Sequence, residues 1–169
     1  MAYNMKDVFY LDTSIDTTTS AGDGLATLDL SSYVDPIARG RAKGTGLAIY
    51  KVHFDICDDD GNSPVAASAT GTFRAGLMSI TGIAAGAVGS VSLNNNTLNA
   101  SNDLMIAGVD FFAGGTAAGD PAPHTFLEPS PEVPYVVVRD QVALIINVTT
   151  AMSAGASVKV RLECAQVQL

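Results

Sequence analysis

Two stretches near the end of the chain, YVVVRDQVALIINV at residues 135–148 and SVKVRLEC at residues 157–164, decide the fold class. The first is dominated by aliphatic residues, many of them the β-branched types that favour strands. In the second, apolar and charged residues alternate with a period of two, as in a strand that buries one face. Residues 152–155 between them are of the kind found in turns. The two stretches therefore predict two long strands separated by a turn, and an all-β protein.

A third strong strand is predicted at residues 45–57, again from a period of two. Its apolar face is predicted to carry Ala48, Tyr50, Val52, Phe54 and Ile56. Its other face is predicted to carry Lys51, His53 and Asp55. Further strands are predicted at residues 6–12, 25–30, 65–74 and 104–112, with two short strands within residues 77–93.

The segments between these runs have the composition of turns and loops. Residues 58–62, Asp-Asp-Asp-Gly-Asn, contain an Asp-Gly pair that suits a tight turn, so strands 45–57 and 65–74 are predicted to form a hairpin. Longer loops are predicted at residues 13–24, 34–44 and 113–134, and the last of these holds five of the seven prolines. Proline-rich loops of this length are often functional.

About eight strands and no predicted helix indicate an antiparallel β-sandwich that spans residues 1–169 as one domain. The strand number favours a single eight-stranded jelly roll. An immunoglobulin-like sandwich is the nearest alternative, but the chain has no tryptophan and lacks the Cys and Trp pattern of that fold.

The composition indicates surfaces that are buried against other subunits. Hydrophobic residues make up 47% of the chain and charged residues 15%, whereas about a quarter is usual for charged residues. So few charges leave apolar surface that is typical of interfaces. A soluble monomer rich in alanine and glycine is the alternative.

The net charge of −8 argues against direct contact with nucleic acid, because binding to phosphates needs clustered lysine and arginine. The local basic cluster of Arg39, Arg41 and Lys43 is predicted to lie in a solvated loop. The first seven residues lack a signal-peptide pattern, and no apolar run reaches the length of about 18 residues that a membrane span requires. The chain is therefore predicted to be synthesised in a cytoplasm.

The search for catalytic and metal-binding patterns predicts neither an enzyme nor a cofactor. Asp58, Asp59 and Asp60 are weak calcium candidates, because the EF-hand pattern fails at its sixth and twelfth positions, Ser63 and Ala69. The two cysteines and two histidines lack the paired spacing of a zinc site, and the cysteines are predicted to be buried free thiols. No nucleophile elbow or phosphate-binding loop occurs.

The strand number, size and composition of the chain, together with the closing pattern from Pro134 to Asp140 and from Val158 to Cys164, resemble the single jelly-roll capsid proteins of tailless icosahedral viruses. The resemblance is closest to those whose shell encloses an internal membrane. It implies a virion protein that forms trimers or pentamers, binds other capsid proteins, lies near an internal membrane and does not touch nucleic acid directly.

Self-association is then expected through apolar strand faces and the long loops. The interface candidates are Arg39, Arg41, Lys43, Pro121, Pro123, Phe126, Pro129 and Pro131. The alternatives are a phage decoration or tail-fibre module, or a monomeric β-sandwich that binds glycans.

Overall fold

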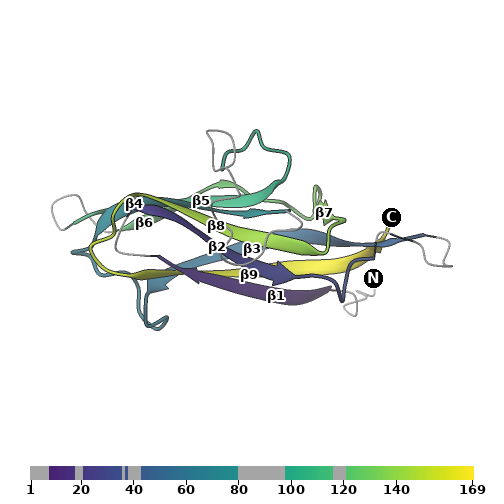
Figure 1. Cartoon of the computed structure of the whole chain (residues 1–169), viewed down its shortest axis with the longest axis horizontal. Helices are drawn as coiled ribbons and strands as arrows, with labels where there is room; N and C mark the ends of the chain where they lie inside the picture. Colours follow the sequence, from purple (N-terminus) through teal and green to yellow (C-terminus); the bar gives the residue numbers. More distant parts are fainter. Residues whose placement is uncertain (1–7, 18–20, 36, 38–42, 80–97, 116–120) are drawn as a thin grey trace.

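The computed structural model describes residues 8–17, 21–35, 37, 43–79, 98–115 and 121–169. These residues form nine strands and no helix (Figure 1). The strands are β1 (Val8–Asp16), β2 (Gly22–Asp29), β3 (Thr45–Asp58), β4 (Thr70–Met78), β5 (Met105–Gly114), β6 (Ala122–Leu127), β7 (Tyr135–Val137), β8 (Gln141–Thr150) and β9 (Ala156–Gln168).

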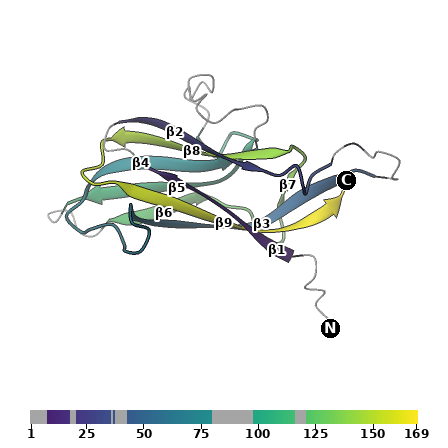
Figure 2. The same ribbon diagram turned by 60° about the horizontal axis from the view of Figure 1, so that its bottom comes forward.

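The strands form two layered sheets, which Figure 1 and Figure 2 show from two sides. One sheet has four strands in the order β1-β9-β3-β7, and the other has five strands in the order β2-β8-β4-β5-β6. All pairings are antiparallel. The predicted all-β class and the antiparallel β-sandwich are therefore confirmed.

The core lies between the sheets and is built from alternate residues of each strand. Leu47 and Leu162 come from the four-stranded sheet, and Leu144 comes from the five-stranded one, all fully buried. Phe73 and Phe111 stack with ring centroids 5.1 Å apart. Burying side chains of this size contributes about 1.5–3 kcal/mol each, which makes this shared layer the main source of stability.

A register shift in β3 changes which residues face the core. The pairing of β3 with β9 skips Tyr50, so that Ile49 lies opposite Cys164 and Lys51 lies opposite Glu163. Leu47 and Ile49 belong to the core before this β-bulge, and Val52 belongs to it afterwards. The prediction that Ala48 and Tyr50 share the core face of Val52 is therefore wrong, because the bulge moves the alternation by one residue.

The stretch 135–148 is not one strand but two, and they belong to different sheets. Strand β7 pairs with β3, whereas β8 pairs with β2 and β4. Residues 138–140 form the crossing, where the Leu30 N–H donates to the Asp140 carbonyl over 2.7 Å. Aliphatic composition predicts strand in both halves, but the polar pair Arg139-Asp140 marks the point where the chain changes sheet.

The turn after β3 forms as predicted, but the hairpin does not. Gly61 has φ of +76°, and its N–H donates to the Asp58 carbonyl over 2.9 Å. Residues 65–69 then carry the chain to the other sheet, where β4 pairs with β5 and β8 instead of β3. Glycine at position 61 allows the left-handed conformation that the turn needs, but the turn does not determine which strand β4 pairs with.

Two of the predicted loops contain strand. Strand β1 extends to Asp16 and β2 begins at Gly22, so most of residues 13–24 is paired backbone. Residues 122–127 within the proline-rich segment form β6 at the edge of the five-stranded sheet. This strand raises the number in the described residues to nine. Residues 6–7, most of 77–93 and part of the basic loop lie outside the described residues.

Candidate functional site

The outer face of the four-stranded sheet carries a dense group of exposed polar and charged side chains. On β9, Val158, Val160 and Leu162 are buried, so Lys159, Arg161 and Glu163 project outward. The alternation in β1 exposes Tyr10, Asp12 and Ser14 in the same way. In β3 it exposes Lys51, His53 and Asp55, as the sequence predicts.

The strand register arranges these nine side chains in three rows across β1, β9 and β3. The rows are Tyr10–Glu163–Lys51, Asp12–Arg161–His53 and Ser14–Lys159–Asp55. Each row places unlike charges on neighbouring strands, which is the favourable arrangement on a sheet. With His53 neutral, three cations balance three carboxylates, so these nine side chains carry no net formal charge on a chain of net charge −8.

Two contacts hold the polar rows in place. The Nε2 atom of His53 lies 2.7 Å from Oε2 of Glu163, with side chains that are 45% and 29% exposed. The guanidinium carbon of Arg161 lies 5.3 Å from the ring centroid of Tyr10. Asp12, Asp55 and Lys159 form no ion pair or hydrogen bond through their side chains with any other described residue. Their charged groups are thus available to a ligand or a partner.

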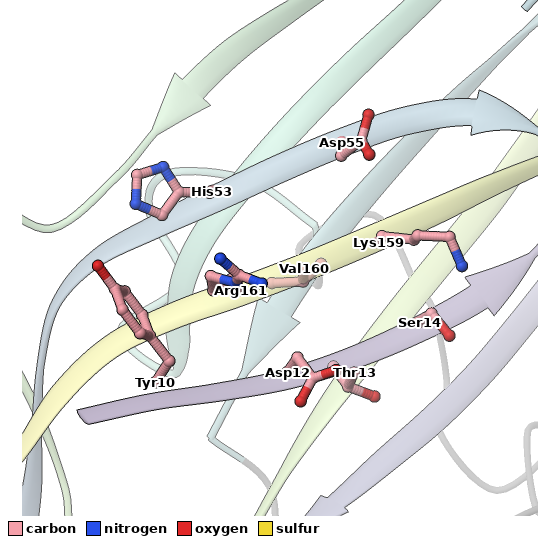
Figure 3. A pocket seen from close by; sticks show the side chains of 9 residues that line it. All are labelled: Tyr10, Asp12, Thr13, Ser14, His53, Asp55, Lys159, Val160 and Arg161. Atoms are coloured by element: carbon pink, nitrogen blue, oxygen red, sulfur yellow. The ribbon is translucent and has the colours of Figure 1, made fainter. Parts of the chain in front are cut away.

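The Asp12–Arg161–His53 and Ser14–Lys159–Asp55 rows, together with Tyr10, line a groove of about 640 Å³ (Figure 3). Its lining comes from the three strands and comprises Tyr10, Asp12, Thr13, Ser14, His53, Asp55, Lys159, Val160 and Arg161. Figure 3 shows Tyr10 and His53 at one end and Ser14 and Lys159 at the other, with Arg161 between them. The groove therefore combines an aromatic ring, two cations and two carboxylates.

The same face becomes apolar beyond Tyr10, toward the C-terminal end of β9. The register row Val8–Ala165–Ala48–Val136 carries no polar side chain. Val8 is 49% exposed, Val136 43% and Leu169 42%. Gly46 lets two of these meet, since a Cβ there would lie 2.8 Å from Leu169 Cδ2 and 3.3 Å from Val136 Cγ1. We call Val8, Gly46, Val136 and Leu169 the apolar end.

On the outer face of the five-stranded sheet, Arg74 joins three segments of the chain. Its Nε and Nη2 donate to the two carboxylate oxygens of Asp110, at 2.6 and 2.9 Å, and its Nη1 donates to the Leu98 carbonyl at 2.9 Å. The guanidinium also lies 4.2 Å from the ring centroid of Phe126. The hydrogen bonds with Asp110 raise the pKa of Arg74 further, so it stays charged.

The predicted interface residue Phe126 is therefore half-buried against its own sheet. It belongs to a second apolar cluster with Met78, Met105, Ala143 and Ile145. Glycine at position 108 makes room for it, because a Cβ there would clash with Phe126 Cζ.

The other predicted interface residues are dispersed. Pro121 precedes β6 and Pro123 lies within it, opposite Phe111. Pro129 and Pro131 follow β6 in the segment leading to β7, and Lys43 is exposed just before β3. Arg39 and Arg41 lie outside the described residues.

The acidic turn after β3 does not gather into a metal site. No group of three histidine, cysteine or carboxylate side chains in the described parts is close enough to hold a metal ion, and this includes Asp58, Asp59 and Asp60. One carboxylate oxygen of Asp58 instead accepts from the Ser63 N–H at 3.4 Å.

Both cysteines are buried free thiols, as predicted. Burial raises the pKa of Cys164 to about 11, and its thiol donates to the Phe9 carbonyl over 3.4 Å. Burial and then the Asp55 carboxylate raise the pKa of Cys57. Both thiols are thus kept in the protonated, unreactive form.

The sequence predicts the polar face of β3, with Lys51, His53 and Asp55, but it does not predict the groove. The signal was present in the alternation of residues 8–14 and 157–164, which expose polar side chains at a period of two. Local alternation does not reveal that β9 lies between β1 and β3.

No protein-family model matches this sequence, and a search of curated proteins finds no significant match. Within the described ranges there is no helix with the length and hydrophobicity needed to cross a membrane.

Proposed function

We propose that the protein is a structural virion protein, a single jelly-roll capsid subunit that self-associates to build the shell. The observation that carries this proposal is the nesting of the strand pairs. The first strand pairs with the last, β2 pairs with β8, β3 with β7, and β4 with β5. This nesting supports the proposal of a jelly roll, in which a long hairpin ribbon is wound into two sheets, with β6 as an extra edge strand. Viral capsid and lectin domains both use this architecture.

Three of the four sheet edges, namely β7, β6 and β1, favour assembly through faces and loops instead of strand addition. Strand β7 has only three residues and follows Pro134, and β6 carries Pro123 within it and Pro121 before it. Strand β1 presents the carboxylates of Asp12 and Asp16. Short strands, prolines and charges are the features that keep sheet edges from pairing with another chain.

The apolar end supplies a face for subunit contact. Val8, Val136 and Leu169 expose nearly half of their surface in the single chain. Burying apolar surface contributes about 25 cal/mol per Å², so a contact between copies that covers these side chains is favourable. The charge-poor composition of the whole chain supports the same role.

The proposed partners are further copies, as trimers or pentamers, and other capsid proteins. The net charge of −8 opposes contact with a genome, which suits a shell separated from it by an internal membrane or by other proteins. Arg39, Arg41 and Lys43 are proposed to pair with acidic neighbours. Pro129 and Pro131 are proposed to make lateral contacts, whereas residues 122–127 pair with their own sheet as β6.

Native mass spectrometry with negative-stain imaging tests the proposal. The wild-type chain is expected to form trimers or pentamers that assemble into closed particles. Val136→Asp places a charge in the apolar end and is expected to give monomers that keep the folded circular dichroism spectrum of the single chain. Phe112→Asp adds the same charge at a side chain that is 56% exposed on the other sheet, and should leave assembly intact.

A wild-type chain that stays monomeric at high concentration would overturn the proposal. Trimers that never form shells would identify a decoration or tail-fibre module instead. Equal disruption by Val136→Asp and Phe112→Asp would remove the apolar end as the contact.

A further inference from the structure

We infer that the groove between β1, β9 and β3 is a binding site for a short saccharide that carries one carboxylate, of the uronic acid class. This inference goes beyond the proposed capsid role and does not depend on it. The groove lies on the same sheet as the apolar end, and its lining residue Tyr10 stands in the register row next to that of Val8.

The charges of the groove select against a highly charged ligand. Lys159 and Arg161 are balanced by Asp12 and Asp55, so the lining has no net formal charge while His53 is neutral. A phosphate dianion or a nucleic-acid strand would face two carboxylates as well as two cations. A ligand with a single negative charge and several hydroxyl groups avoids that repulsion.

Each part of such a saccharide has a matching group in the lining. Lys159 and Arg161 lie two residues apart on the same face of β9, roughly 7 Å along the strand, where they can bracket one carboxylate. Asp12 and Asp55 face them from the two flanking strands and accept hydrogen bonds from hydroxyl groups. Asp12, Asp55 and Lys159 are unpaired with any described side chain, so binding breaks no ion pair among them.

Tyr10 supplies an apolar platform at one end. Its side chain is 61% exposed, and the Arg161 guanidinium 5.3 Å from its ring centroid helps to hold its orientation. The C–H face of a sugar ring packs on such an aromatic surface while its hydroxyl groups remain free to bond. The volume of about 640 Å³ lies within the usual range for small-molecule sites and exceeds one sugar ring.

Saturation-transfer NMR with the full chain tests this inference in whatever assembly the protein forms. The probe is methyl β-D-glucuronide, compared with methyl β-D-glucoside and acetate at one ionic strength, and inorganic phosphate, which has no observable protons, is added as a competitor of the glucuronide. The glucuronide is expected to bind best, because it alone offers both a carboxylate and a sugar ring.

Two lysines give a matched pair of variants. Lys159→Gln removes a positive charge that lines the groove, whereas Lys51→Gln removes one from the same face outside the lining. Lys159→Gln is expected to weaken glucuronide binding by about fivefold to thirtyfold, the loss for one charged hydrogen bond, and Lys51→Gln by less than about twofold. Tyr10→Phe is expected to keep binding and Tyr10→Ala to lose it.

Failure of every probe to bind would overturn the inference, as would equal weakening by the two lysine variants. Displacement of the glucuronide by an equal concentration of phosphate would also overturn the inference, because it would show a site for anions in general. Native masses of the same variants separate this result from the capsid proposal. If Lys159→Gln abolishes assembly and the wild type binds no glucuronide, the groove is a subunit contact and the saccharide site is refuted.

Discussion

At the scale of single residues, Arg74 joins β4 to three other segments of the chain. It links β4 to β5 through Asp110, to residue 98 through a carbonyl, and to β6 through the Phe126 ring. Arg74→Ala is expected to lower the free energy of unfolding by about 1–2 kcal/mol, a figure reduced because the side chain is 38% exposed. Denaturant unfolding of the wild type and the variant measures this change in the free energy of unfolding.

Arg161→Ala provides the comparison for Arg74, because Arg161 contacts Tyr10 without a carboxylate partner in the described structure. It should change stability by less than about 1 kcal/mol. Equal losses in the two variants would mean that the hydrogen bonds of Arg74 contribute nothing beyond an exposed cation–π contact.

Cys164 should make the stability fall at alkaline pH. Its folded pKa of about 11 lies above the ordinary value of 9.0, so the unfolded chain releases the thiol proton first as the pH rises. The unfolded state then gains charge that the buried thiol cannot, and stability declines between about pH 9 and pH 11. Cys164→Ala is expected to reduce this decline in thermal unfolding curves. An identical alkaline profile in both proteins would contradict it.

At the scale of strands, local sequence patterns identified most elements but not their partners. Val158, Val160 and Leu162 alternate with charged residues, and that pattern alone placed β9 correctly. The stretch 135–148 also reads as strand throughout, yet its two halves join different sheets. Pairing between distant strands depends on how the whole core packs, so a local sequence pattern does not predict it.

The prediction of which β3 residues face the core is wrong for a related reason. The bulge at Tyr50 arises in the register with β9, more than a hundred residues away in sequence. The same limit hid the groove, since Asp12, Arg161 and His53 form one row only after three strands pair. By contrast, the Asp58–Gly61 turn was predictable because its geometry is local.

Strand β6 should be the part of the five-stranded sheet that opens most easily. Four of its six residues are exposed, and Phe126 anchors it against Gly108 and Arg74. Phe126→Ala is expected to speed amide hydrogen exchange at residues 122 and 124–127 by about tenfold or more, with little change in β8. Tyr10→Ala, which removes a 61% exposed ring from the four-stranded sheet, is the control and should leave that exchange unchanged. Faster exchange throughout both sheets would show that β6 has no separate opening.

At the scale of the whole molecule, the two proposed kinds of subunit contact respond to salt in opposite ways. Contacts through the apolar end depend on burial of Val8, Val136 and Leu169, which excluded salts such as sulfate strengthen. Contacts made by Arg39, Arg41 and Lys43 with acidic neighbours are screened, because the Debye length falls from about 10 Å at 0.1 M salt to about 3 Å at 1 M. Salt dependence therefore identifies which contact holds the subunits together.

We expect assembly to persist when NaCl is raised from about 0.1 M to about 1 M, and to strengthen in sulfate. Light scattering across this series measures it, with Val136→Asp as a variant that should stay monomeric in every salt. Dissociation of the wild-type chain at high NaCl would instead assign the contact to the basic loop. In that case Lys43→Gln should weaken assembly at low salt, and the exposed valines and leucine of the four-stranded sheet would have no part in it.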